Sequence, residues 1–146
     1  MDTSDLGTVK GLVVDSSIRI QAERGRLMTA QVIRSLRGQA GDVPIALSAI
    51  TVAELGHGIY HTAVREKAVL RRKFLDELVR YIPVHPISAA TAELIARVGG
   101  EQALRGITVP FPDLIIGACA LELNYAVATH NPRHFRLIPN LDVRTF

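Results

Sequence analysis

The sequence of 146 residues predicts an α/β fold in which helices cover both faces of a mainly parallel sheet. Short β-branched segments alternate along the chain with longer segments whose apolar residues recur with the period of an α-helix. This alternation is typical of β-α-β units, which align their strands in parallel. The chain length and the 48% hydrophobic content indicate one domain with its own core, and we expect it to span residues 1–146.

Five segments are predicted to be strands. The first is rich in β-branched residues and ends at Asp15, which is the pattern of a strand buried in a sheet. Pro83 and Pro86 flank the core of the third segment, so we expect that strand at an edge, where a missing N–H donor is tolerated. The predicted strands cover residues 9–14, 45–47, 82–85, 125–129 and 141–144.

Helices are predicted between these strands because residues that favour helix starts precede segments with helical periodicity. Serine hydroxyls accept hydrogen bonds from the first free N–H groups of a helix. Serines stand at three such places: Ser16 and Ser17 together, Ser48, and Ser88. Pro112 and Asp113 are both favoured in a first helical turn. The predicted helices are a short one after Ser17 and longer ones at residues 27–36, 48–60, 64–80, 88–104 and 111–123, with a loop or helical turn at 130–135.

Two of these helices carry more detailed expectations. Gly38 and Gly41 are expected to end the helix at 27–36, since glycine favours helix ends. The helix at 64–80 is expected to bury one face against the core. The residues predicted for that face are Val64, Ala68, Leu75, Leu78 and Val79.

The composition excludes several classes of protein. The single Cys, Cys119, forms no internal disulfide and no cysteine-based zinc site, so we expect a small core residue and a cytoplasmic protein. No apolar run reaches the ~20 residues of a membrane span, and Asp2 and Asp5 argue against a secretory signal. The net charge of +3 permits a nucleic-acid partner without predicting one. No glycine-rich phosphate-binding loop occurs, so a nucleotide cofactor is not expected.

Acidic residues lie next to the predicted strands at positions that favour one shared edge of the sheet. Asp15 ends the first strand, Glu54 lies in the helix after the second, and Asp113 begins the helix before the fourth. Asn131 follows the fourth strand, two residues after Thr129. In an open α/β sheet, ligand sites form outside the carboxyl ends of the strands. We therefore expect these residues to converge.

Each acid also has a purely structural interpretation. Asp15 would cap the next helix, Asp113 would compensate the dipole of its own helix, and Glu54 would face solvent. If all three instead share one apolar cleft, they repel one another and resist ionisation. A divalent ion removes this conflict, and oxygen ligands favour Mg²⁺ or Mn²⁺. Such a site supports in-line displacement at a phosphodiester, which is nuclease or phosphatase chemistry.

Four segments in order resemble the PIN-domain ribonucleases of the VapC toxin type. They are VVDSS at residues 13–17, ITVAEL at 50–55, DLIIGA at 113–118 and ATHNPRHF at 128–135. The sequence IPNLDV at 138–143 also resembles the C-terminal strand of that family, so the resemblance covers residues 9–143. Two features depart from the family pattern. Gly117 stands where Ala is common, and Phe111 and Pro112 replace a more polar approach to Asp113.

The resemblance implies a PIN-like three-layer α/β/α fold with a short, mainly parallel central sheet of about five strands. It implies a metal-dependent endoribonuclease, the toxin of a type II toxin–antitoxin module, which forms a homodimer and is inhibited by a cognate antitoxin. The acidic set of the family maps onto Asp15, Glu54 and Asp113, which would hold Mg²⁺ or Mn²⁺. The fourth position of that set, Asp or Asn in the family, maps onto Asn131.

Residues around this set receive supporting roles. Thr129 and either Ser16 or Ser17 would orient the carboxylates or the metal-bound waters. Arg133 and His134 stand at the expected mouth of the cleft and would contact RNA phosphates. Hydrolysis by an activated water would leave 5′-phosphate and 3′-hydroxyl ends. Two alternatives stay open: a catalytically silent PIN-like binding module, and a metal-dependent DNase or phosphatase on the same site.

Further residues have less specific interpretations. His57 and His61 lack the neighbours that a zinc-protease or di-iron helix motif requires, so we expect ordinary packing or solvent contact. The basic run at residues 71–73 is either a solvated helix face or an RNA contact. Three apolar residues near the first helices belong either to the core or to a groove for a partner: Ile18, Ile20 and Leu27.

Overall fold

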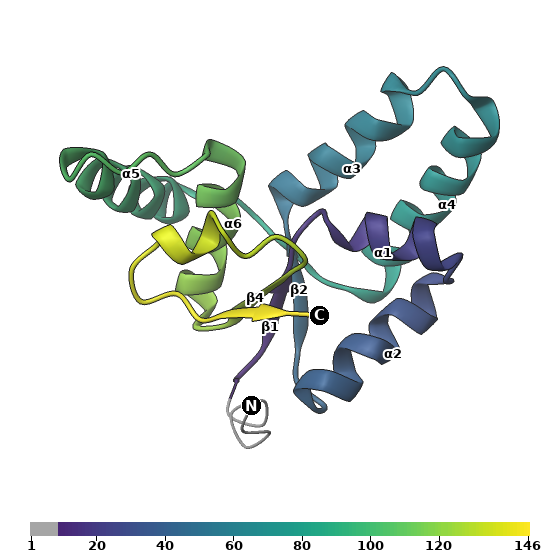
Figure 1. Cartoon of the computed structure of the whole chain (residues 1–146), viewed down its shortest axis with the longest axis horizontal. Coiled ribbons are helices and arrows are strands. Elements are labelled where there is room, and N and C mark those ends of the chain that lie inside the picture. The colour runs from purple at the N-terminus through teal and green to yellow at the C-terminus, as the bar shows by residue number, and fades with distance from the viewer. Residues whose placement is uncertain (1–8) are drawn as a thin grey trace.

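The computed structural model describes residues 9–146 and contains the predicted parallel sheet with helices on both faces (Figure 1). The strands are β1 (Leu12–Val14), β2 (Ile45–Ser48), β3 (Val84–His85), β4 (Ala126–Thr129) and β5 (Val143–Thr145). They are ordered β3-β2-β1-β4-β5, and every neighbouring pair is parallel. The expected edge position of β3 is confirmed. Asp2 and Asp5, on which the expectation about a secretory signal depended, lie outside the described residues.

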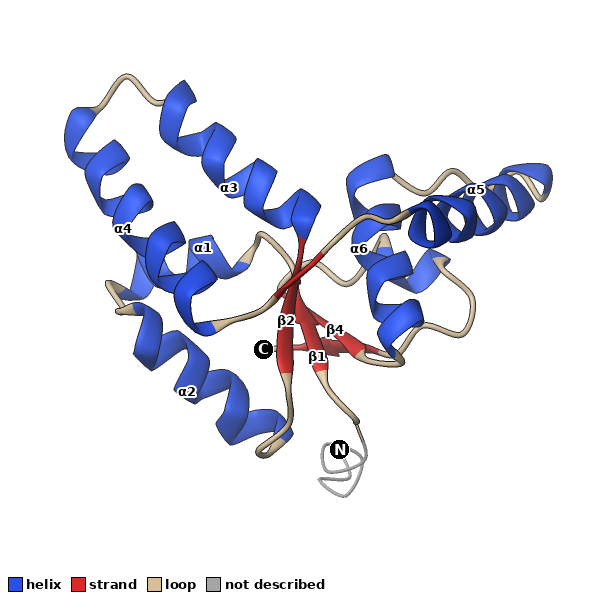
Figure 2. Ribbon diagram, turned by 180° about the vertical axis from the view of Figure 1, so that it is seen from behind, coloured by secondary structure: helices blue, strands red, loops and turns tan. Residues whose placement is uncertain are grey.

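Helices form a layer on each side of the sheet, which confirms the three-layer prediction (Figure 2). One layer contains α1 (Ile18–Gly25), α2 (Thr29–Ala40), α3 (Ala49–His61) and α4 (Arg65–Tyr81). The other contains α5 (Ala89–Leu104) and α6 (Phe111–Leu123), with the short 3₁₀ turn η2 (Phe135–Leu137) beside them. Within residues 9–146, none of these helices is long and apolar enough to cross a bilayer.

The alternation of side chains along the central strands builds two cores. Leu12 and Val14 of β1 face the core shared with α1 to α4, whereas Val13 faces the core shared with α5 and α6. Strand β4 repeats the pattern in its alanines and in Val127. Both faces of the sheet are therefore buried, which is why its strands are continuous apolar runs in the sequence. Cys119 lies in the second core as expected, and burial raises the pKa of its thiol to about 12.

Helix starts follow the predicted capping chemistry at two of the three predicted places. The Ser48 hydroxyl accepts from the Ile50 N–H at 3.3 Å, and the Ser88 hydroxyl accepts from the Thr91 N–H at 3.2 Å. Ser17 occupies the N-cap position of α1 but makes no capping bond, because its hydroxyl is engaged elsewhere. The expectation that this hydroxyl caps α1 is therefore wrong.

Several element boundaries differ from the prediction. Strand β1 begins at Leu12 rather than at residue 9, and β5 is displaced to Val143–Thr145. Helix α2 begins at Thr29 and continues through Gly38 to Ala40, since the packing of its apolar face outweighs the low helix propensity of one glycine. Gly41, with a φ of 86°, ends it. Glycine tolerates this left-handed value, which strains other residues.

The apolar face of α4 is only partly as predicted. Leu75 and Leu78 are buried, but Val64 and Val79 are exposed. Figure 1 shows the reason: α3 and α4 form a hairpin that extends away from the sheet, so α4 is covered on one side only. Ile18, by contrast, lies fully in the core.

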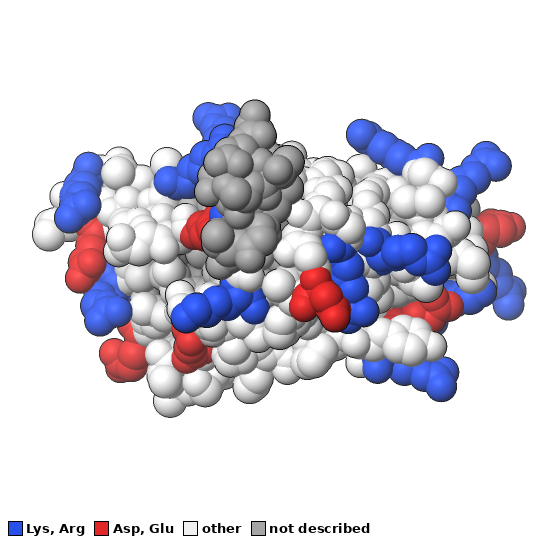
Figure 3. Space-filling view, turned by 90° about the horizontal axis from the view of Figure 1, so that it is seen from below, with Lys and Arg blue, Asp and Glu red and all other residues white. Residues whose placement is uncertain are grey.

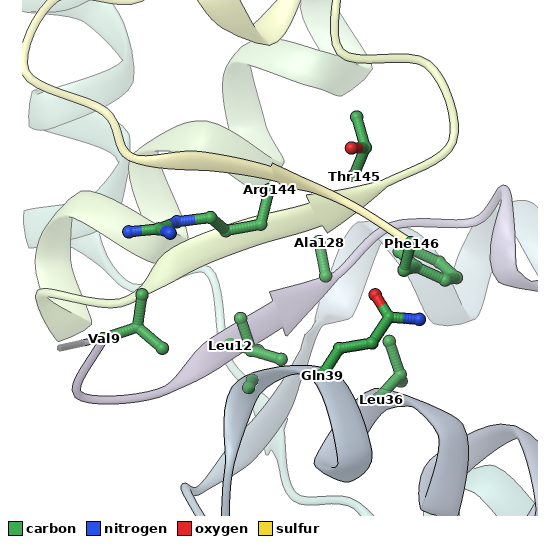
Figure 4. A pocket seen from close by; sticks show the side chains of 9 residues that line it. Val9, Leu12, Leu36, Gln39, Ala128, Arg144, Thr145 and Phe146 are labelled. Atoms are coloured by element: carbon green, nitrogen blue, oxygen red, sulfur yellow. The ribbon is translucent and has the colours of Figure 1, made fainter. Parts of the chain in front are cut away.

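A small cavity of about 20 Å³ lies where α2 meets β1, β4 and the C-terminal residues (Figure 4). Leu12, Leu36, Ala128 and Phe146 are among its lining residues. This volume accommodates about one water molecule. It is a packing gap of the first core rather than a substrate site.

We expect Leu78→Ala to lower the free energy of unfolding by about 2–5 kcal/mol, because Leu78 is 0% exposed and its removal leaves a cavity. Chemical denaturation measures the change. The matched control is Leu70→Ala on the same helix, where the side chain is 67% exposed and the expected change stays within about 0.5 kcal/mol. Equal losses in the two variants would contradict the packing described for α4.

Candidate active site

The strand order places a candidate site at the carboxyl ends of β1 and β4. From β1 the chain passes outward to β2 and β3, then returns to the other side of β1 for β4 and β5. The two central strands therefore diverge into connections on opposite sides, which leaves a crevice at their carboxyl ends. Asp15 follows β1 directly, and Asn131 lies two residues after β4.

The carboxylate of Asp15 is buried, at 6% exposure, and fully hydrogen-bonded. Its Oδ1 accepts from the N–H of Ser17 at 3.2 Å and from the hydroxyl of Ser17 at 2.5 Å. Its Oδ2 accepts from the Thr129 hydroxyl at 2.9 Å. Burial raises the pKa of this carboxyl, these hydrogen bonds oppose the rise, and the charge of Asp113 adds a smaller increase.

The same two hydroxyls also tie down the loop after β4. The Ser17 hydroxyl accepts from the His130 N–H at 3.0 Å, and the Thr129 hydroxyl accepts from the Asn131 N–H at 2.9 Å. Asn131 is thereby fixed by its backbone while the residue itself is exposed. Ser17 and Thr129 each join Asp15 to the loop that carries Asn131.

Glu54 comes from the opposite direction, in the second turn of α3. Its Oε1 is buried and has no hydrogen-bond partner within residues 9–146. Desolvation raises the pKa of Glu54, and the charges of Asp113 and then Asp15 raise it further, while a hydrogen bond with the Ser16 side chain lowers it. The charge of Asp113 thus acts on both Asp15 and Glu54, which indicates that the three acids lie near one another.

Asp113 lies in the first turn of α6, from the other helical layer. Its Oδ2 is 3.0 Å from Nδ1 of His134, and both side chains are accessible. The structure thus brings Asp15, Glu54 and Asp113 to one edge of the sheet from three separate segments.

The acids are neighbours but do not enclose an ion by themselves. In the described part of the chain, no group of three or more His, Cys, Asp or Glu residues is gathered tightly enough to hold a metal ion. The donor set still fits Mg²⁺, which binds through one or two carboxylates and otherwise keeps water and substrate oxygens. The buried Oε1 of Glu54, which has no hydrogen-bond partner within residues 9–146, also fits a site that accepts a cation.

The other candidate residues lie outside this cluster. His57 and His61 are exposed on α3 with their rings stacked, 5.3 Å between centroids. In the basic run, Arg71 pairs with Glu23 at 2.9 Å and donates to the Gly58 carbonyl at 2.9 Å, so it joins α1, α3 and α4. This part of the run is structural rather than a free RNA contact.

The surface seen in Figure 3 has no continuous basic patch. Lys and Arg side chains alternate there with Asp and Glu side chains and with uncharged surface. This agrees with the modest net charge of +3. The view looks at the end of the sheet where β1 begins, so attraction of a polyanion to that end is weak, and the view does not include the carboxyl ends of the strands. Arg133 is exposed two residues after Asn131.

Three contacts were not accessible to sequence reasoning. They are the His134–Asp113 pair, the packing of the His130 ring against Phe146 with centroids 4.3 Å apart, and the bridge made by Arg71. Each joins segments whose relative placement depends on the tertiary fold. For the histidine contacts, the sequence offered one signal: His130 and His134 lie close in the chain to a residue of the predicted acidic site, Asn131.

Comparisons with known proteins give related sequences and structures. A family model described as PIN domain matches residues 12–140. The chain is 30% identical over 135 residues to "Ribonuclease VapC" of Rickettsia bellii (strain RML369-C), a match that covers 92% of this chain and 96% of the relative. It is 28% identical over 135 residues to "Ribonuclease VapC1" of Rickettsia felis, with the same coverage of both chains.

Solved structures share the fold. VapBC2 from Rickettsia felis, bound to a DNA fragment from its promoter, matches with a TM-score of 0.78 at 23% identity, covering 93% of this chain and 98% of the other. VapBC-5 from Mycobacterium tuberculosis, a member of the VapBC family of toxin–antitoxin systems, matches with a TM-score of 0.69 at 23% identity, covering 94% and 98%.

We expect Glu54→Gln to raise the melting temperature of the metal-free protein at pH 8, because it removes a charge that burial and two neighbouring acids disfavour. A raised folded-state pKa means that wild-type stability falls as pH rises from the unfolded-state pKa through the folded-state pKa. The advantage of the variant is therefore greatest at pH 8 and shrinks as pH falls and Glu54 takes up a proton.

Thermal unfolding in EDTA across this pH range measures the effect. The control is Glu93→Gln, which changes an exposed glutamate at a similar position in α5 and should leave the melting temperature unchanged. A variant at Glu54 that is less stable than wild type at pH 8 would contradict the electrostatic coupling.

Proposed function

Because this chain belongs to the PIN domain family, we propose that it is a metal-dependent endoribonuclease and the toxin of a toxin–antitoxin pair. The observation that carries the proposal is the meeting of Asp15, Glu54 and Asp113 at the carboxyl edge of the sheet, with coupled charges and an unpartnered Glu54 oxygen. The relatives named ribonuclease match nearly the whole chain, which supports an RNA substrate. We expect such a nuclease in the cytoplasm, as a homodimer.

The proposed cofactor is Mg²⁺ or Mn²⁺, held by Asp15, Glu54 and Asp113. When bound, the ion supplies Lewis-acid stabilisation of the negative charge that develops at the phosphodiester. Ser17 and Thr129 hold the Asp15 carboxylate in place, and their hydrogen bonds partly oppose the rise that burial causes in its pKa. The Asp15 carboxylate is therefore already held in one orientation before a cation binds.

The remaining residues position the substrate. Asn131, neutral and exposed, offers an amide that hydrogen-bonds the scissile phosphate or the attacking water without adding charge. Arg133 contacts the RNA backbone and carries no sequence information. No nucleophilic side chain is needed, and Cys119 is sealed in the core. Hydrolysis by water is expected to leave 5′-phosphate and 3′-hydroxyl ends.

We expect the purified protein to cleave total RNA into discrete fragments with Mg²⁺ or Mn²⁺ and to lose this activity in EDTA. Asp113→Asn should lower the rate at least about 100-fold, which corresponds to about 2.7 kcal/mol of transition-state stabilisation. His57→Asn, on the exposed part of α3, is the control that should cleave normally. Gel analysis with end mapping measures rates and product ends.

Three outcomes would contradict this assignment in different ways. Normal cleavage by Asp113→Asn overturns the proposed mechanism. Equal or greater activity on DNA favours the metal-dependent DNase. Absence of turnover with any divalent ion, combined with retained RNA binding, favours the catalytically silent module.

The antitoxin is proposed to dock in a groove of about 600 Å³ between α1, the start of α2 and α4. Its apolar lining includes Leu27, Leu70 and Phe74, and Leu70 is exposed. Its charged rim carries more cations than acids: Arg19, Arg26, Lys67, Arg71 and Lys73 against Glu23 and Glu77. This composition suits an amphipathic segment with acidic residues. Of the residues predicted for a partner groove, Leu27 lines it, whereas Ile18 lies in the core.

We expect Leu70→Glu to weaken binding of the cognate antitoxin at least about 30-fold, the loss typical of a central apolar contact. Isothermal titration calorimetry with the purified pair measures it. Val69→Glu is the matched control, because Val69 is equally accessible on α4 but does not line the groove. Ribonuclease activity should stay unchanged in both variants. Equal affinity of both variants would rule out this groove.

A further inference from the structure

Each acid of the candidate site has a side chain that holds it in place. Ser17 and Thr129 hold Asp15, and Ser16 contacts Glu54. For Asp113, the hydrogen-bond partner within residues 9–146 is the His134 ring, with 3.0 Å between Nδ1 and Oδ2. His134 was predicted to contact RNA phosphates, whereas its ring contacts an acid of the site.

The backbone of His134 is firmly anchored, although its ring is accessible. His134 is the N-cap residue of η2, and its carbonyl accepts from the Leu137 N–H at 3.1 Å. The next residue, Phe135, is buried at 1% exposure. Ile138, at the end of the turn, packs directly over Gly117 of α6 and leaves no room for a Cβ there. The loop after β4 is therefore fixed against the same helix that carries Asp113.

We propose that His134 is a positioning residue for Asp113, an inference that rests on the proposed metal-dependent function. The Nδ1–H of His134 donates to Oδ2, which fixes the carboxylate rotamer and leaves Oδ1 for the divalent cation. Asp113 starts a helix at an accessible position, so without this bond its side chain is free to turn towards solvent. Partners that hydrogen-bond a metal ligand typically account for 10–100-fold in metal affinity.

Substitution of His134 by Asn or by Gln separates the effect of the Nδ1 hydrogen bond from that of having a polar side chain at this position. Asn places its amide N–H close to the position of the imidazole Nδ1–H, whereas Gln places its amide near Nε2. His134→Ala removes the donor altogether. We therefore expect Mn²⁺ affinity to fall about 10–100-fold in His134→Ala and His134→Gln, and to remain within about threefold of wild type in His134→Asn.

Mn²⁺ titration followed by electron paramagnetic resonance measures the affinity directly, without any cleavage assay. RNA binding in EDTA is measured in parallel and should be the same in wild type and His134→Ala. Arg133→Ala should show the opposite pattern, with weaker RNA binding and unchanged Mn²⁺ affinity. His57→Asn controls for the loss of an accessible imidazole, and thermal unfolding verifies that every variant is folded.

Each contrary result has a distinct meaning. Failure of the wild-type protein to bind Mn²⁺ overturns the proposed metal centre and this inference with it. Normal Mn²⁺ binding by folded His134→Ala overturns the inference alone. Equal weakening in the Ala and Asn variants shows that the Nδ1 hydrogen bond is not the cause. Weaker RNA binding in EDTA with unchanged Mn²⁺ affinity assigns His134 to the RNA instead.

Discussion

The buried carboxylate of Asp15 constrains the arrangement of the chain around it. An ionised carboxylate out of contact with solvent is strongly destabilising unless hydrogen bonds replace its water. Here Ser17 and Thr129 provide those bonds, and Thr129 is at the right place only because β4 pairs with β1 in the observed register, with Val14 opposite Ala128. A slip of one residue would turn the Thr129 side chain to the other face of the sheet.

The site lies at the junction of the two helical layers, and this location explains how repelling charges are held together. Glu54 is carried by α3 and Asp113 by α6, and each helix is anchored by its own apolar core. Leu55 follows Glu54 into one core, and Leu114 follows Asp113 into the other. The burial of these neighbours stabilises the fold and opposes the cost of placing the acids together. Burial is the main cause of the raised pKa of Asp15 and of Glu54, and repulsion between the acids raises both pKa values further.

Local signals in the sequence were sufficient for the order of elements and for most helix starts. Ser48 and Ser88 act on groups two or three residues away, so their roles are readable from the chain alone. The prediction that Val64 and Val79 are buried was wrong, because periodicity identifies an apolar face but not how much of that face a neighbour covers. In the candidate site, likewise, the sequence does not show which side chains from distant segments come into contact.

The placement of Asp15 and Asp113 near strand ends followed from the α/β pattern, and their roles as metal ligands stay predictions. The use of Ser17 for Asp15 rather than for capping, and of His134 for Asp113, depends on distances across the fold. A separation of 21 residues gives no local periodicity from which the second pair could be inferred.

The pairing of β1 with β4 joins residues 114 positions apart in the chain, Asp15 and Thr129. A nascent polypeptide therefore lacks an assembled cleft until most of the chain, including β4, has left the ribosome. A product that ends after α3 but before β4, through a nonsense codon or stalled translation, contains Asp15 and Glu54 but has no Thr129 to hold Asp15, and it lacks both β4 and β5. We expect such fragments to lack the assembled site, so that a cell translating this message imperfectly meets the activity only through finished copies.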